Sequence, residues 1–106
     1  MPKYLWKASY TTKGVRGVAN EGGSSRRDAV KQVTESIGGT LEGFYFAFGE
    51  DDAYVIADLP DNETAAAVAL AVNGSEGAVV QTVVLMTPEE LDAASKKEVD
   101  FRPAGG

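Results

Sequence analysis

A segment rich in glycine, serine and arginine is the first candidate for chemistry in this sequence. It lies just before a predicted helix and contains the candidate ligand-binding residues Gly22, Gly23, Ser24, Ser25, Arg26 and Arg27. Free amides, hydroxyl groups, guanidinium groups and the positive end of a helix dipole are the components of a phosphate or carboxylate site. The spacing matches neither the P-loop nor the dinucleotide-binding fingerprint. A solvated loop that caps a helix is the alternative, and the simpler, interpretation.

Aromatic side chains on the predicted strands form a second candidate. Strands of this kind can line an apolar ligand cavity on the sheet face away from the helices, with tyrosine hydroxyls as its few polar groups. The alternative is that these side chains form the core and a subunit interface. The candidate cavity residues are Trp6, Tyr10, Tyr45, Glu50 and Tyr54.

Three consecutive carboxylates, Glu50-Asp51-Asp52, form a third candidate in a predicted turn. Clustered carboxylates can bind a hard cation or raise one another's pKa. A calcium loop needs more oxygen ligands at fixed spacing than three consecutive residues can offer. A solvated turn is therefore favoured, and no metal site is predicted.

The sequence lacks two residue types that carry much of protein chemistry. It has no cysteine and no histidine. Thiol nucleophiles, iron-sulfur clusters, thiolate zinc sites, histidine-ligated haem and serine-histidine catalysis are thereby excluded. No nucleophile-base pair can be assembled from spacing, so we predict no catalytic residues and no cofactor.

Charge is distributed unevenly along the chain. The formal net charge is -6, yet residues 1–31 hold seven lysines and arginines against two acidic residues, a net +5. An acidic total disfavours nucleic-acid and anionic-membrane partners, which require clustered positive charge. The N-terminus has no apolar signal-like region and no stretch approaches about 18 apolar residues. A cytoplasmic protein is the expectation.

The elements that must position these candidates follow from periodicity and from turn signals. The chain of 106 residues is 43% hydrophobic, which predicts one domain over residues 1–98 and a tail over 99–106. Alternating or continuous apolar patterns predict strands, and a glycine-rich segment, 12–23, predicts a loop with one short helical turn. The predicted strands are 3–11, 40–48, 53–59 and 77–86. In the second, Leu41 is expected on the face opposite Phe44, Phe46 and Phe48.

Capping signals place three helices. Ser25 and Asp28 match a capping box, and Val30, Val33 and Ile37 then form a buried stripe that ends at Gly38-Gly39. The segment Pro60-Asp61-Asn62 ends the third strand and caps a second helix, which ends at 73–74. Thr87-Pro88-Glu89-Glu90 begins a third helix, over 88–97.

This order predicts an α+β fold, a ferredoxin-like βαββαβ sandwich with an accessory C-terminal helix. Two helices can cover only one face of a four-stranded sheet, yet both faces carry apolar residues. A second copy of the chain is the simplest cover for the other face. We therefore expect a homo-oligomer built on a dimer, of the dimeric α/β barrel type.

Several segments resemble the GYD-domain family of small bacterial and archaeal proteins. They recur in one order along the chain: residues 2–5, 8–11, 43–52, 57–61, 85–90 and 101–103. The resemblance implies a ferredoxin-like domain similar to the dimeric α/β barrel group, and no established activity. Asp51 stands where the family's naming tyrosine would be, so no role of that tyrosine is carried over.

Two functions of different class remain after these exclusions. The first is a non-catalytic homo-oligomeric domain that binds a small anionic or aromatic metabolite or a partner protein. The alternative is a cofactor-free oxygenase or isomerase acting on an aromatic or polyketide-like substrate. Phe101 and Arg102 in the tail are expected to dock on the same chain or on an adjacent one.

Overall fold

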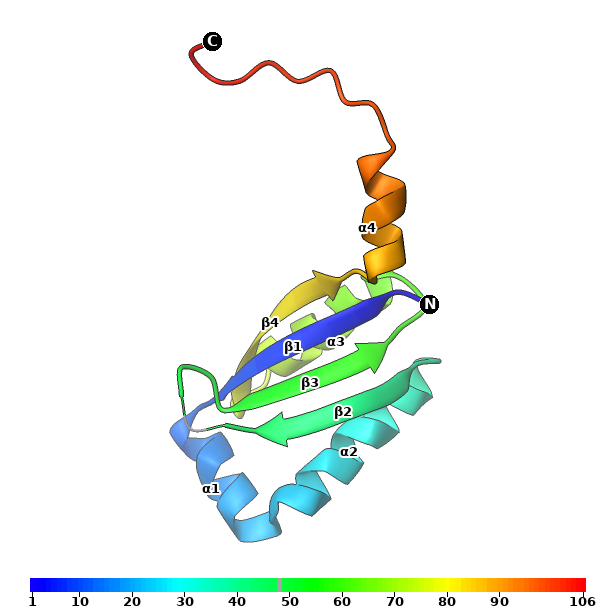
Figure 1. Ribbon diagram of the computed structural model, residues 1–106. Helices are drawn as coiled ribbons and strands as arrows, with labels where there is room; N and C mark the ends of the chain where they lie inside the picture. Colours follow the sequence, from blue (N-terminus) through cyan, green and yellow to red (C-terminus); the bar gives the residue numbers. More distant parts are fainter. Residues whose placement is uncertain (48) are drawn as a thin grey trace.

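The computed structural model describes residues 1–47 and 49–106 of the chain. Phe48, expected at the end of the second strand, lies outside the described residues. Four strands and four helices form an α+β domain (Figure 1). In chain order they are β1 (Lys3–Tyr10), α1 (Thr12–Glu21), α2 (Gly23–Ser36), β2 (Thr40–Phe46), β3 (Ala53–Asp58), α3 (Asn62–Asn73), β4 (Ala78–Leu85) and α4 (Pro88–Ser95).

The four strands form one antiparallel sheet in the order β2-β3-β1-β4. This order is consistent with the ferredoxin-like expectation. Helices α2 and α3 lie on the same side of the sheet, α2 along β2 and α3 along β4 (Figure 1). The other side, which we call the open face, is covered by no helix of the described residues.

The core lies between the sheet and these two helices. Alternate residues of β1 and β3 point into it, and Tyr4 and Trp6 are only 1% and 4% exposed. Directly paired residues of antiparallel strands share a face, so Val55 opposite Trp6 belongs to the same layer. The buried cluster is completed by Ala57, Leu59, Ala65 and Val80.

The segment predicted as a glycine-rich loop is instead the helix α1. Thr11 caps it, because its hydroxyl accepts a hydrogen bond of 3.1 Å from the amide of Gly14. A Cβ at Gly14 would overlap the carbonyl oxygen of Gly77. The helical glycine therefore allows close approach to a distant loop, and this tertiary contact outweighs its weak helix propensity.

The capping box predicted at Ser25 is also wrong. Helix α2 begins at Gly23, and its N-cap is Gly22, which has no side chain to cap it. Gly22 has φ of 93°, a conformation that glycine adopts readily and that turns the chain directly from α1 into α2. The early start places Ser25 inside the helix.

The predicted stripe of Val30, Val33 and Ile37 on α2 is only partly buried, since Val33 is 50% exposed.

A bulge in β2 corrects the predicted faces of that strand. Leu41 pairs with Ala57 and Phe44 with Val55, and the register shifts between Leu41 and Gly43. One extra residue in a strand restores the same face to residues at odd spacing. Leu41 and Phe44 therefore both pack against the core, whereas strict alternation placed them on opposite faces.

The predicted caps of the later helices are confirmed. Asp61 caps α3, and Thr87 with Glu90 forms a capping box on α4, which ends at Ser95 rather than at 97. Helix α4 and the tail project away from the sheet (Figure 1). Phe101 is 74% exposed, so it does not dock on its own chain, and docking on an adjacent chain stays a prediction. Within the described residues, every helix is too short or too polar to cross a membrane.

Candidate functional site

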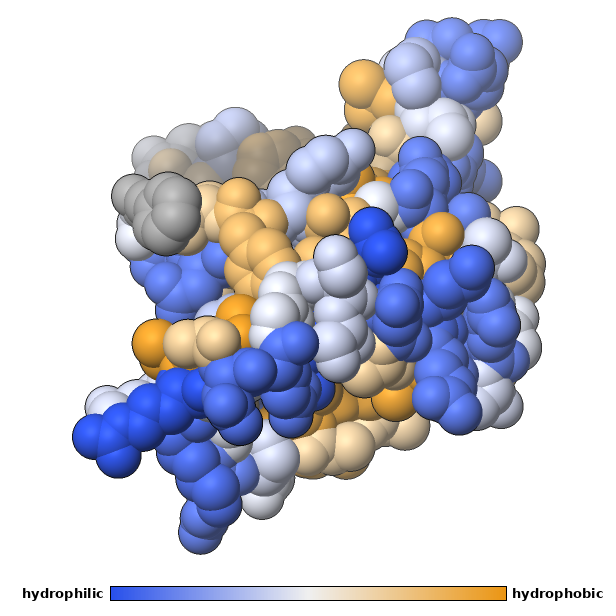
Figure 2. Space-filling view, turned by 90° about the horizontal axis from the view of Figure 1, so that it is seen from below, coloured by the Kyte–Doolittle hydropathy of each residue, from blue (hydrophilic) through white to orange (hydrophobic). Residues whose placement is uncertain are grey.

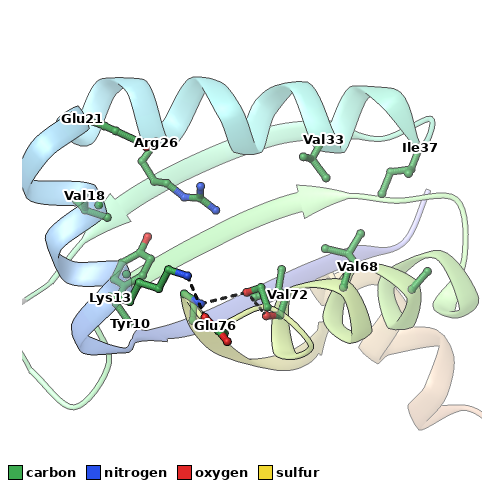
Figure 3. A pocket seen from close by; sticks show the side chains of 17 residues that line it. Tyr10, Lys13, Val18, Glu21, Arg26, Val33, Ile37, Val68, Val72 and Glu76 are labelled. Carbon is green, nitrogen blue, oxygen red and sulfur yellow. Dashed lines mark hydrogen bonds and ion pairs between the residues drawn. The ribbon is translucent and has the colours of Figure 1, made fainter.

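A cavity of about 650 Å³ opens on the helix-covered side of the sheet. Side chains of α2 and α3 form its two walls, and α1 closes one end (Figure 3). Val33 projects from α2 and Val72 from α3 toward the space between them. Viewed from the side of α1 and α2, apolar residues reach the surface between hydrophilic ones (Figure 2). We call this space the outer chamber.

A second, smaller cavity of about 130 Å³ borders the core, and we call it the inner pocket. Its walls include Trp6, Phe44 and Val55. Tyr10 and Arg26 line both cavities, so these two residues stand where the outer chamber meets the inner pocket. The two cavities together form one cleft between α2 and α3, apolar inside and polar at a few positions.

Arg26 is the cationic residue that lines both cavities. Its side chain points from α2 into the outer chamber (Figure 3), and it is partly buried. No carboxylate of the described residues lies within ion-pair distance of its guanidinium group. Arg27, the next residue, is exposed and contacts Asp28 at 3.3 Å. The two arginines thus differ in both direction and pairing.

Tyr10 lies beside Arg26 at the end of β1. Burial raises the pKa of the Tyr10 phenol, and the nearby Arg26 guanidinium partly opposes this shift. The backbone amide of Tyr10 donates to Asp52 at 2.8 Å, which holds the end of the strand. Because its pKa is raised, the hydroxyl stays protonated at neutral pH and can donate a hydrogen bond.

The indole of Trp6 supplies a further donor. Its Nε1 is buried and has no hydrogen-bond partner among the described residues. Most buried polar groups are paired, so this nitrogen is an exception in the core of the domain.

The mouth of the outer chamber carries a pair of opposite charges. Lys13 of α1 contacts Glu76, in the connection between α3 and β4, at 2.9 Å (Figure 3). Both side chains are exposed, so the pair contributes little to stability. Glu21, at the end of α1, also lines the chamber.

The six residues of the predicted glycine-serine-arginine site do not lie together in one site. Of its six residues only Arg26 lines the cleft. Gly22 and Gly23 make the turn between α1 and α2, while Ser24, Ser25 and Arg27 are exposed. The predicted segment therefore contributes one side chain to the cleft, and it does so through the face of α2 rather than through its N-terminus.

The predicted aromatic cavity is divided by the sheet. Trp6 and Tyr10 line the cleft, but Tyr54 pairs with Lys7 and with Tyr45 on the open face. Glu50 is exposed in the connection between β2 and β3. The cleft of the single chain lies on the helix-covered side, whereas the expected cavity lies on the other side of the sheet and stays a prediction for the oligomer. The open face of the single chain carries the tyrosines without enclosing them.

The acidic turn has a structural role. Asp52 accepts the Tyr10 amide, and Asp51 accepts a hydrogen bond of 3.2 Å from Ser9 and contacts Lys7 at 3.8 Å. Both carboxylates thus tie the connection between β2 and β3 to β1. Over residues 1–47 and 49–106, no group of three or more acidic side chains is placed to hold a metal ion.

The space between α2 and α3 was not predicted from the sequence. Ala67 and Ala71 line the outer chamber from α3, where larger side chains would fill it. Small residues on α3 could have indicated a cavity, but they are equally typical of a helix that packs closely against its neighbour. Only the distance between α2 and α3 distinguishes these two outcomes.

Comparison with known proteins identifies one family. The family model of the GYD domain matches residues 4–95, from β1 to the end of α4. No curated protein and no solved structure shows a significant match. The matched region includes every strand and helix that lines the cleft. The chain therefore belongs to the GYD domain family.

Proposed function

We propose that this chain is a non-catalytic domain that binds a small anionic or aromatic metabolite in the cleft between α2 and α3. The observation that carries the proposal is the outer chamber of about 650 Å³, joined to the inner pocket at Arg26 and Tyr10. Small-molecule sites generally have volumes of roughly 300–1,000 Å³, apolar walls and a few polar groups. The cleft has all three properties.

Binding is favoured over the alternative, a cofactor-free enzyme acting on an aromatic or polyketide-like substrate. Tyr10 has a raised pKa, which suits a hydrogen-bond donor and not a base that removes a proton at neutral pH. Glu50, the other candidate for proton transfer, lies outside the cleft. Glu21 and Glu76 are exposed at the mouth, away from the inner pocket.

The domain is further proposed to act as a homodimer in which two sheets pack through their open faces, as in the dimeric α/β barrel group. Apolar side chains such as Ile56 and the 39%-exposed Val83 lie on this face. Its lysines are already paired within the chain, Lys3 with Asp58 at 3.0 Å and Lys7 with Asp51. This internal pairing lowers the cost of removing the face from water.

The binding proposal is tested with 8-anilinonaphthalene-1-sulfonate, an aromatic anion that fluoresces in apolar sites. We expect saturable binding of one molecule per chain. Ala67→Phe fills the outer chamber and is expected to weaken binding about ten-fold or more. Ala66→Phe is the matched control, because Ala66 is also exposed on α3 but does not line the cleft. Equal binding by both variants would contradict the proposal.

A further inference from the structure

The outer chamber has a polar end and an apolar end. Arg26 projects into the end beside α1, and the pair of Lys13 and Glu76 lies at this same end (Figure 3). At the other end the labelled side chains are Ile37 and Val68, which are both aliphatic. A ligand that fits the chamber along its whole length is therefore divided in the same way, with one polar end and one apolar end.

The polar end offers one positive charge that no carboxylate of the described residues neutralises. Arg26 is partly buried and forms no ion pair with these residues, whereas Lys13 contacts Glu76 at 2.9 Å. Glu21 adds a further negative charge to the lining. A single available cation matches a monoanion better than a phosphate dianion. The planar N–H donors of a guanidinium group match the two oxygen atoms of a carboxylate.

Tyr10 is placed to donate to the same carboxylate. Its hydroxyl points toward the Arg26 side chain, and both residues line the chamber (Figure 3). Burial raises the pKa of the Tyr10 phenol, so the hydroxyl stays protonated at neutral pH and remains a donor. Arg26 and Tyr10 thus present a charged and a neutral donor at one end of the chamber.

The rest of the chamber is lined by aliphatic side chains. Tyr10, at the polar end, is the only aromatic residue among the described residues that line it, and the walls beyond are valine, isoleucine and alanine. Arg26 and Ile37 are eleven residues apart, which is about 16 Å along a helix. An extended chain advances about 1.2 Å per bond, so about eight to twelve carbon atoms fit into this length. A flexible alkyl chain therefore suits the chamber better than a flat ring.

We infer that the outer chamber binds a medium-chain fatty acid, with its carboxylate at Arg26 and Tyr10 and its alkyl chain between α2 and α3, directed toward Ile37. This inference rests on the proposed function, because it names the class of ligand for the same cleft. It selects an anion with an aliphatic body over an aromatic one.

Three ligands that each have ten carbon atoms test the two ends by calorimetry. Decanoate has the carboxylate and the full alkyl chain, 1-decanol lacks the charge, and 4-phenylbutanoate keeps the carboxylate but has a shorter body that ends in a ring. We expect decanoate to bind about ten-fold or more tightly than either of the other two.

A series of chain lengths tests the path of the alkyl chain. From butanoate to decanoate, each added methylene group should raise the affinity about three-fold, because it is buried against the aliphatic walls. In Ala67→Phe the affinity should stop rising at a shorter chain, since Ala67 lines the chamber next to Val68. Ala66→Phe, outside the cleft, should follow the unmodified protein. Affinity that does not depend on chain length would overturn the inference.

Three variants test the polar end. Arg26→Gln is expected to weaken decanoate about ten-fold or more and to leave 1-decanol unchanged. Arg27→Gln is the matched control, since Arg27 is exposed and paired with Asp28. Tyr10→Phe keeps the ring and removes only the hydroxyl, so it should weaken decanoate about three-fold or more.

The outcomes separate the two proposals. If the sulfonate probe binds and Ala67→Phe blocks it, but decanoate binds no more tightly than 1-decanol or 4-phenylbutanoate, the fatty-acid inference is wrong and the binding function stands. Equal loss of decanoate binding in Arg26→Gln and Arg27→Gln would also overturn the inference. If neither the sulfonate nor decanoate binds, both proposals are wrong.

Discussion

Gly14 connects one helix to a loop more than sixty residues away in sequence. It lies in α1, where glycine normally costs stability relative to alanine. Its backbone lies against the carbonyl of Gly77, and no side chain fits in between. Gly17, one turn further, has nothing within 4 Å of the position that a Cβ would take. The two glycines of one helix therefore differ in what an added methyl group would meet.

Replacement of each glycine by alanine should therefore have opposite effects. Gly14→Ala is expected to destabilise the protein by about 1–3 kcal/mol, because the added methyl group displaces the connection before β4. Gly17→Ala should stabilise it by about 0.5–1 kcal/mol through helix propensity alone. Urea unfolding of both variants measures the difference. A stabilised Gly14→Ala protein would show that α1 does not pack against Gly77.

At the scale of elements, α3 forms one wall of the cleft and depends on a single cap. Asp61 accepts hydrogen bonds of 2.8 Å and 2.6 Å from the amide and hydroxyl of Thr64. These bonds stabilise the ionised carboxylate and lower the pKa of Asp61 below its ordinary value of 3.8. Because the pKa of Asp61 is lower in the folded protein, its ionised carboxylate stabilises the fold above pH 3.8. This stabilisation is lost as the pH falls through the pKa that Asp61 has in the folded protein.

Asp61→Ala should lower the melting temperature at neutral pH by about 4–8 °C, because the amide of Thr64 loses its acceptor. Asp61→Asn keeps a capping oxygen without a titrating group, so it should retain most of the neutral-pH stability. Thermal melts from neutral pH down to about pH 2 should show a smaller acid loss for Asp61→Asn than for the unmodified protein. Identical pH profiles would rule out a contribution from this carboxylate.

For the whole molecule, the central question is what covers the open face. Val83 and Val84 are adjacent on β4 and point to opposite sides of the sheet, Val83 with Leu5 and Val84 with Tyr4. Both are exposed in the single chain, at 39% and 57%. They therefore form a matched pair of sites for introducing a charge.

Sedimentation at micromolar concentration should show a dimer of the 11.1 kDa chain. Val83→Glu is expected to weaken the dimer about ten-fold or more, because the interface would bury an unpaired carboxylate. Val84→Glu should leave the dimer unchanged. A monomeric unmodified protein, or an equal effect of both substitutions, would contradict packing through the open face.

The sequence by itself determined the features that depend on neighbouring residues. Asp61 and Thr87 cap the helices where they were predicted to, because a cap needs only an oxygen and an amide three residues away. Tyr4 and Trp6 share the core face because alternation is a property of any strand. The order of the four strands along the chain follows from similar local signals and agrees with the structure. The GYD resemblance is confirmed by the family model over residues 4–95.

The tertiary structure decided whatever depends on residues far apart in the chain. Gly14 is helical because α1 packs on Gly77, and Leu41 joins Phe44 in the core because Glu42 is the extra residue of a bulge beside β3. The side of the sheet that holds the cleft was likewise undetermined. A gap between two helices arises from how the helices sit on the sheet, and no local pattern of residue types encodes that distance.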